Sequence, residues 1–388
     1  MIGKDFFVTL ACSLSLLSYG LTISVAGPAM EGIQRTFSVA AGAAGFLFTV
    51  LSVGLILTVL LSGYLIGRWS LKGGGVLGQG LLTAGLALCA AADTYPAGMA
   101  AFFLMGMGGG CIEIATNTTV AALHRENRAT ALNLLHFCFG VGALSGPLIS
   151  GWLIETGAGW QAAFSVIAAF SGLVTATLAV SRFPRDADPG RMTRAVAATL
   201  MGSGYMRLIC LAVVLYVGIE MAITSWAVLF MERTLGATPF SAGAKLSYFW
   251  TAMTFGRLLC AGLSRRLSSR DILVGLTLPA CGAMVLFVLA PSAMIAGLAL
   301  AMTGLCFSGL FPVLVALCGN RFPQIIGTGT LILMAFMGVG LMVFPWLTGV
   351  LAESLSLKSA MAVLVLALAA LAAAALRIRN LTPRRSVP

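Results

Sequence analysis

The side chains of this chain that could do chemistry lie inside long apolar segments. Glu113 stands in the run GMGGGCIEIATN, and Asn117 follows it four positions later. Asn133 and His136 are three apart near the start of the next apolar segment. Residues three or four apart share one face of a helix. If both segments are neighbouring helices, these four side chains can form one polar cluster.

Glu113 is the candidate for binding a proton. A dry interior disfavours the ionised carboxylate, so a carboxyl group placed there can gain and lose a proton near neutral pH. This behaviour suits a proton-driven carrier, with Asn117 as the hydrogen-bonding neighbour. The alternative is a neutral glutamate whose hydrogen bonds serve helix packing. Upstream, Gly106 and Gly110 share a helix face and, with Gly109, would let a neighbouring helix approach closely.

The second half of the chain holds a further set of charged residues. Glu220 lies in LYVGIEMAITSW, and Lys245 and Arg257 lie in the following apolar segment. Lys245 could be the charge partner of Glu220. Alternatively, Glu220 faces a central cavity and hydrogen-bonds a substrate. Arg257 lies nearer the end of its segment, where a long side chain can extend to the membrane surface.

Trp226 offers a flat surface on which a sugar ring could stack, and Trp250 belongs to a set of aromatic residues of which one or two could line the cavity. The other members of this set are Tyr216, Phe249, Phe307 and Phe311. Packing is the alternative role for this set, and a position at the membrane interface is the alternative for Trp226. The candidate substrate-binding residues are therefore Asn117, Asn133, His136, Glu220, Trp226 and Trp250.

Composition indicates a membrane protein. The chain has 388 residues, of which 59% are hydrophobic and 9% charged, and its mean hydropathy is +1.02. Soluble domains are about 25% charged, so most of this surface is expected to face lipid. A charge at bilayer depth costs about 2.5–3.5 kcal/mol or more, which makes each charge inside an apolar segment a candidate for function.

The apolar segments predict an all-α protein with twelve transmembrane helices, because about 20 apolar residues span a bilayer. The polar stretch from Ser181 to Arg207 divides them six and six. The predicted domains are an N-terminal half at 1–182, a cytoplasmic linker at 183–206 and a C-terminal half at 207–388. The predicted helices are 5–27, 40–67, 74–92, 96–122, 129–154, 160–182, 207–231, 240–264, 271–290, 292–319, 327–350 and 357–379.

The basic residues predict the orientation of these helices. The formal net charge is +11, and most lysines and arginines fall in segments on one side of the predicted membrane. Arg35, Arg233 and Lys358 fall on the other side. Cytoplasmic loops are rich in Lys and Arg, so both termini are predicted to be cytoplasmic. The charge is thus a topology signal and gives no support to nucleic-acid binding.

No cofactor, metal site or catalytic apparatus is expected from the sequence. The nine cysteines all fall in predicted apolar helices and form no CxxC pair, as expected of small buried side chains. With two histidines in the chain, a histidine-based metal site is not expected. The sequence contains no recognisable set of nucleophile and base, which argues against an enzyme.

The two halves resemble each other. GVGALSGP, from Gly140 to Pro147, matches GVGLMVFP, from Gly338 to Pro345, at an offset of 198 residues. Two six-helix halves repeated in parallel orientation are typical of a major facilitator transporter, with its substrate site between the halves near mid-membrane.

The chain also resembles the fucose–galactose–glucose:proton symporter branch of this superfamily. The similar stretches are GMGGGCIEIATN, NLLHFCFGVGALSGP and YVGIEMAITSW. The resemblance implies that Glu113 takes part in proton coupling and substrate recognition, and that Asn133 and His136 correspond to the family's asparagine and histidine on the fifth helix. It implies symport of a small polar solute, above all a sugar, by a multi-pass protein of the bacterial inner membrane that works as a monomer.

Efflux is the alternative function. Gly142, Gly146, Pro147 and Gly151 approximate the fifth-helix signature of drug:proton antiporters. Close packing of small residues beside a proline kink explains the same pattern. Symport and antiport therefore both remain open at this point.

Overall fold

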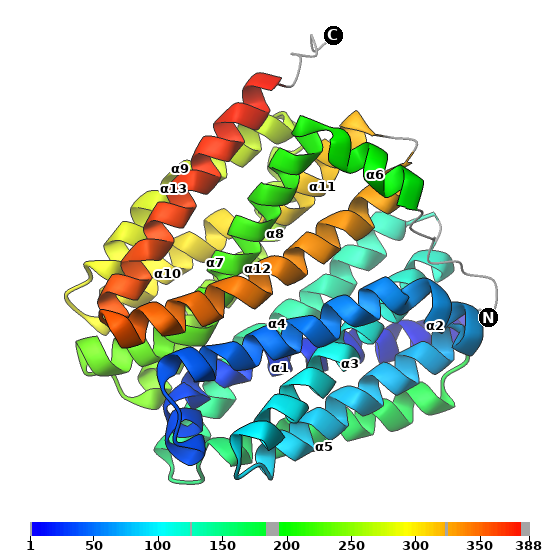
Figure 1. Cartoon of the computed structure of the whole chain (residues 1–388). Coiled ribbons are helices and arrows are strands. Elements are labelled where there is room, and N and C mark those ends of the chain that lie inside the picture. Colours follow the sequence, from blue (N-terminus) through cyan, green and yellow to red (C-terminus); the bar gives the residue numbers. More distant parts are fainter. Residues whose placement is uncertain (1, 125, 184–193, 323–324, 382–388) are drawn as a thin grey trace.

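The computed structural model describes the chain except for residues 1, 125, 184–193, 323–324 and 382–388. Every element in the described part is a helix (Figure 1). The predicted linker lies partly outside the described residues, and its end contains a short helix, α6. The helices are α1 (Ile2–Phe37), α2 (Ala41–Ala90), α3 (Tyr95–Leu123), α4 (Arg128–Glu155), α5 (Trp160–Val180), α6 (Arg194–Gly202), α7 (Gly204–Leu235), α8 (Pro239–Leu263), α9 (Ser269–Val288), α10 (Ala293–Phe307), α11 (Leu310–Arg321), α12 (Ile326–Ser354) and α13 (Leu357–Leu381).

Eleven segments among the described residues are long and apolar enough to cross a membrane, where the sequence predicts twelve. Helix α2 supplies two of them, Ala41–Leu61 and Ser70–Ala90, separated at Ser70, whose φ of 62° breaks the helix. Helices α10 and α11 together form one candidate span, Ala293–Arg321. Helix α8 is not among the eleven, because Lys245 and Arg257 and several polar residues lower its hydropathy.

The helices form two groups that meet along a central interface. Helices α1 to α5 pack among themselves, as do α7 to α13, and α2 packs on α12, α4 on α8 and α1 on α7 across the interface. Helix α6, the start of α1 and the end of α13 lie toward one end of the bundle, which we call the terminal end (Figure 1). The connections at 38–40, 156–159, 236–238 and 355–356 lie at the opposite end, here the distal end.

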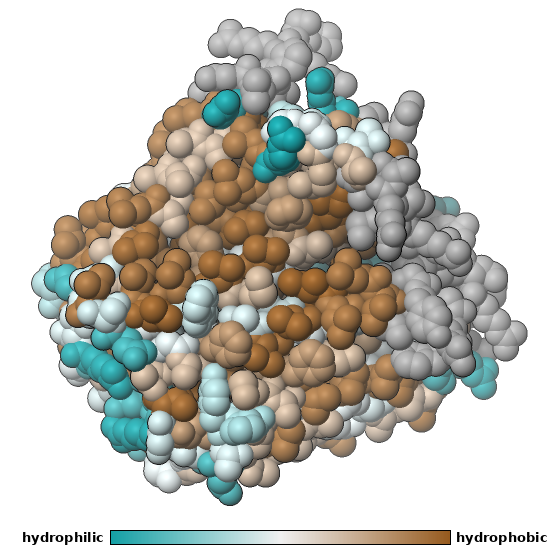
Figure 2. Space-filling view, viewed as in Figure 1, coloured by the Kyte–Doolittle hydropathy of each residue, from teal (hydrophilic) through white to brown (hydrophobic). Residues whose placement is uncertain are grey.

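The outward surface is apolar, as a lipid-facing surface must be. Figure 2 shows apolar side chains over most of the visible face, with hydrophilic ones gathered toward its edges. Large apolar side chains are exposed on several helices, among them Leu173, Leu258 and Leu366.

A buried network of hydrogen bonds ties α1, α2 and α5 together. The Gln79 amide donates to Ser18 Oγ at 3.1 Å and to Ser171 Oγ at 2.8 Å, and Ser15 donates to Gln79 Oε1. Thr83 joins the same network through Ser171 at 2.7 Å. Because the carbonyl oxygen and the amide nitrogen of Gln79 both have partners, the network stiffens this half of the molecule.

The glycines of α3 allow close packing on two neighbouring helices, α2 and α1. A Cβ at Gly106 would overlap the Leu51 carbonyl oxygen of α2, and one at Gly110 would lie 3.0 Å from Thr58 Cβ of the same helix. This confirms that Gly106 and Gly110 face one neighbour. A Cβ at Gly109 would instead overlap the ring of Tyr19 on α1.

We expect Gly106→Ala to destabilise the protein by about 1–3 kcal/mol, because its methyl group meets a backbone carbonyl that cannot move without separating α2 and α3. Thermal unfolding of the purified protein in detergent measures the loss. Gly282→Ala in α9 is the matched control, since nothing lies within 4 Å of a Cβ there and alanine favours a helix. Equal stability of the two variants would contradict the packing argument.

Candidate functional site

Glu113, Asn117 and His136 form a hydrogen-bonded chain between α3 and α4. The Asn117 amide donates to Glu113 Oε2 at 2.8 Å and to the Glu113 backbone carbonyl at the same distance. His136 Nε2 lies 3.1 Å from Asn117 Oδ1. At that distance a protonated Nε2 donates to the amide oxygen, which itself cannot donate. The structure thus brings together three of the four side chains expected to cluster.

Tyr19 of α1 completes the surroundings of this carboxyl group. Its side chain is 4% exposed, and it interacts electrostatically with Glu113. The ring packs against Phe139 of α4, with centroids 5.8 Å apart. It reaches this place because Gly109, one turn before Glu113, has no side chain to exclude it. The glycine-rich run therefore positions an aromatic hydroxyl beside the acid.

Glu220 is the corresponding acid of the second group of helices. It lies on α7, where its carboxyl group interacts with the Tyr216 side chain one turn earlier. Its backbone carbonyl accepts a hydrogen bond from Thr224 Oγ1 at 2.9 Å. Tyr216 is buried, 3% exposed, against Phe307 of α10. Each group of helices therefore presents one carboxyl group with a tyrosine close to it.

Arg257 of α8 interacts with ionisable side chains from both groups of helices. Its guanidinium interacts electrostatically with Glu113 and His136 from the first group of helices. It also interacts with Glu220 and Tyr216 from the second group. Its Nε atom is buried without a hydrogen-bond partner. An extension of Arg257 to the membrane surface, which its place in the sequence allows, does not fit the buried Nε and the interaction of the guanidinium with both acids.

The charged side chains of this site keep some accessible surface. Glu113, Asn117, His136, Glu220 and Arg257 are each intermediate between buried and exposed. The surrounding helices therefore shield these side chains only in part.

Two predicted residues lie away from this arrangement. The Lys245 ammonium donates to Ser241 Oγ at 2.9 Å, and the aliphatic part of its side chain packs on Gly297 of α10. Glu220 interacts electrostatically with Arg257, whereas the described contacts of Lys245 are with Ser241 and Gly297, which favours the alternative in which Lys245 is not the charge partner of Glu220. Asn133 is exposed, and no hydrogen bond in the described structure joins it to the cluster of Glu113.

The two candidate tryptophans are both buried. Trp226 is 0% exposed and donates from Nε1 to the Pro345 carbonyl oxygen of α12 at 2.9 Å. In this conformation it has no free face for a sugar ring, and it holds α7 to α12. Trp250 is 1% exposed, but its Nε1 is buried without a partner. Trp250 therefore retains an unused donor near the interface.

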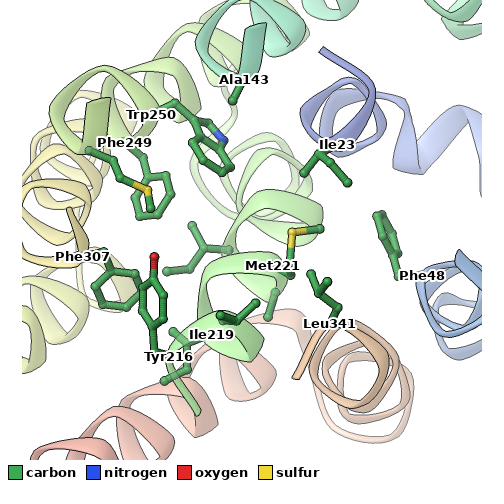
Figure 3. Close-up of a cluster of buried hydrophobic side chains, with 14 of the residues drawn as sticks. Ile23, Phe48, Ala143, Tyr216, Ile219, Met221, Phe249, Trp250, Phe307 and Leu341 are labelled. Atoms are coloured by element: carbon green, nitrogen blue, oxygen red, sulfur yellow. The ribbon is translucent and has the colours of Figure 1, made fainter. Parts of the chain in front are cut away.

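Trp250 belongs to an aromatic cluster that reaches from one group of helices to the other. Its ring lies edge-on to Phe249 on the same helix, at 5.5 Å, and to Phe139 of α4, at 6.1 Å. Figure 3 shows Phe249, Phe307 and Tyr216 gathered beside it, with Ala143 of α4 and Ile23 of α1 on the opposite side. The aromatic set is thus mainly packing, and Trp250 is its member nearest the other half.

The sequence did not indicate Tyr19 as part of the site. It indicated Tyr216 and Arg257, but not their interactions with the two acids. Tyr216 precedes Glu220 by four residues, so helical spacing could have found it. Tyr19 and Arg257 carry no such local signal, because their partners lie on other helices. No group of three or more His, Cys, Asp or Glu side chains that could hold a metal ion occurs within the described part of the chain.

The fold is shared with solved transporter structures. The nucleoside transporter NupG superposes with a TM-score of 0.81 at 13% identity, covering 98% of this chain and 100% of that chain. A D-xylose-proton symporter superposes with a TM-score of 0.80 at 16% identity, covering 98% of each chain. At these identities the likeness is one of fold.

Three relatives are similar in sequence over most of the chain. An uncharacterized MFS-type transporter of Yersinia pestis is 23% identical over 352 residues, 89% of each protein. A TsgA homolog of Serratia proteamaculans is 24% identical over 284 residues, 71% of each. A Helicobacter pylori protein named "Putative glucose/galactose transporter" is 25% identical over 277 residues, 66% of this chain and 65% of that protein.

The family model spans both groups of helices. Residues 12–324 and 208–388 match the model of the Major Facilitator Superfamily. The apolar, all-helical architecture with eleven candidate spans agrees with that match. The chain therefore belongs to the Major Facilitator Superfamily, and it is a multi-pass transporter of the inner membrane and not an enzyme.

Proposed function

We propose that this protein carries a small polar solute, most readily a sugar, into the cell together with a proton by alternating access. The observation that carries the proposal is that Arg257 interacts electrostatically with Glu113 of one group of helices and with Glu220 of the other. A carboxyl group that alternates between a bound proton and an ion pair with a cation can couple proton release to a change of conformation.

Glu113 is the proposed proton-coupling residue. Its carboxyl group has a defined hydrogen-bond donor in Asn117, which His136 in turn contacts. When protonated, it no longer attracts Arg257, and the two groups of helices are free to rearrange. When ionised, it pairs with Arg257 and holds the interface. Its partial accessibility gives the proton a route to water.

A sugar is the proposed class of solute. The site offers amide, imidazole, phenol, carboxyl and guanidinium groups, which hydrogen-bond hydroxyl groups, and the free Nε1 donor of Trp250 adds one more. The name of the Helicobacter pylori relative and the fold shared with a D-xylose-proton symporter support the same class. Glu220 and Asn117 are the proposed substrate contacts; His136 and Trp250 belong to the same surroundings.

The proposed topology has twelve spans with both termini in the cytoplasm. Helix α8 is the twelfth span: its 25 residues are long enough to cross a bilayer, and its charges face Ser241 and the central site rather than lipid. The proposed domains are 1–182 and 207–388, joined by a linker at 183–206. The site lies within one chain, so a monomer is the expected working unit. The distal end then faces outward.

Solute-evoked proton movement tests the proposal. Cells that express the protein, given a panel of hexoses and pentoses without a prior proton gradient, are expected to alkalinise the weakly buffered medium on addition of the transported sugar. Cells with an empty vector are the control. Acidification of the medium on addition of a lipophilic cation, with no response to any sugar, would favour efflux and contradict the symport proposal.

A further inference from the structure

The offset of 198 residues that relates the two halves in sequence also relates the contacts between them at the distal end. Helix α2 meets α12 there, and α8 meets α4. Two hydrogen bonds and two glycine contacts of the first pair have counterparts in the second at that offset, with donor and acceptor in the same roles. The interface at this end therefore contains two copies of the same set of contacts.

The first copy joins the start of α2 to the end of α12. The Gly42 backbone N–H donates to Glu353 Oε2 at 3.2 Å. Ala40 is the N-cap residue of α2, and its side chain makes no capping hydrogen bond. Alanine is a poor N-cap because it has no acceptor. Glu353, from the opposite half, supplies the missing cap.

The second copy joins the start of α8 to the end of α4. The Phe240 backbone N–H donates to Glu155 Oε2 at 3.0 Å, and the Thr238 hydroxyl also interacts with this carboxylate. Phe240 lies 198 residues after Gly42, and Glu353 lies 198 residues after Glu155. The same backbone position of each helix is thus capped by a carboxylate of the other half.

Further matched contacts extend inward from these caps. Thr49 Oγ1 donates to the Met342 carbonyl at 2.7 Å, and its counterpart Ser247 donates to the Leu144 carbonyl at 2.7 Å. Two matched pairs of glycines let the backbones approach closely. Gly45 faces the carbonyl of Pro345 as Gly243 faces that of Pro147, and Gly349 faces the carbonyl of Ala41 as Gly151 faces that of Pro239.

We infer that Glu155 and Glu353 are paired positioning residues of the transport cycle, which hold the distal end closed by capping a helix of the opposite half. The inference rests on the proposed alternating access. A carboxylate is stabilised at a helix N-terminus because of the unpaired N–H groups and the helix dipole there. Opening the distal end breaks both caps at once, since each spans the interface between the halves.

The distance between two spin labels, measured by pulsed electron paramagnetic resonance, tests the inference. The labels are attached at Ala158 and Leu355, which are exposed in distal connections of opposite halves. The background replaces Cys138 and Cys281 by alanine, because the other seven cysteines are buried. Glu155→Ala and Glu353→Ala are each expected to raise the ratio of distal-open to distal-closed molecules roughly two- to fivefold, the effect of a charge at a helix end. The double variant should show about the product of the two ratios.

Glu126→Ala, which removes an exposed glutamate at the terminal end, is the matched control and should leave the distances unchanged. Glu155→Gln and Glu353→Gln each keep an acceptor and should show a larger distal-closed population than the corresponding alanine variants. Distances in the double variant that equal those of the control would overturn the inference. Because the readout needs neither sugar nor proton gradient, a shifted distance with no sugar transport would count against the proposed function alone.

Discussion

Glu113→Gln is expected to abolish uphill accumulation of the solute while leaving its exchange across the membrane in place. Glutamine has nearly the shape of glutamic acid and still accepts from Asn117, but it carries no exchangeable acidic proton. A gradient of one pH unit stores about 1.4 kcal/mol per proton, which supports about tenfold accumulation at one proton per solute. The variant should reach a ratio of about one. Proteoliposomes with an imposed pH gradient measure both ratios, and counterflow without a gradient measures exchange.

Glu220→Gln is the informative comparison for this prediction. It removes the second acid that interacts electrostatically with Arg257. We propose that this acid, Glu220, contacts the solute. We therefore expect a higher half-saturating concentration with accumulation retained. If Glu113→Gln accumulated solute as the wild type does, Glu113 would not be the coupling site. If Glu220→Gln instead lost accumulation and kept its affinity, the two roles would be exchanged.

Arg257→Gln is expected to lower coupled uptake on the order of 100-fold, because removing one member of a set of partly buried charged groups leaves the others uncompensated. Glu113 and Glu220, one from each half, both interact electrostatically with this cation. Without it, neither carboxylate has a partner that holds it ionised when the proton leaves. Initial rates of gradient-driven uptake, normalised to protein amount in the vesicles, measure the loss. Arg257→Lys keeps the charge and should recover part of the rate.

Lys245→Gln is the matched control for Arg257. The two cations lie on the same helix, but the Lys245 ammonium donates to Ser241. We expect Lys245→Gln to keep uptake within a few-fold of the wild type, since losing a single partly exposed hydrogen bond has a small effect. Equal losses in the two variants would show that charge on α8 matters for stability or insertion rather than for coupling.

The sequence by itself determined the class of the protein and the contacts that depend on spacing along one helix or between consecutive helices. Its hydropathy predicts a membrane protein of apolar helices, and the comparison with family models confirms the predicted superfamily. The chain of Glu113, Asn117 and His136 was also predictable, because two of its members are four residues apart on one helix and the third lies on the next helix in sequence. Local spacing and chain connectivity suffice for such contacts.

The tertiary structure alone decided which helix faces meet across the interface between the halves. Arg257 and Lys245 are twelve residues apart on α8, and composition does not tell which of them faces the acids. The answer depends on how α8 is rotated about its axis, and packing against α4 and α10 sets that rotation. The same holds for Trp226, which packing buries against α12, and for Glu155 and Glu353, whose partners lie in the opposite half. Sequence spacing defines the faces of a helix, whereas only the assembled bundle defines what each face contacts.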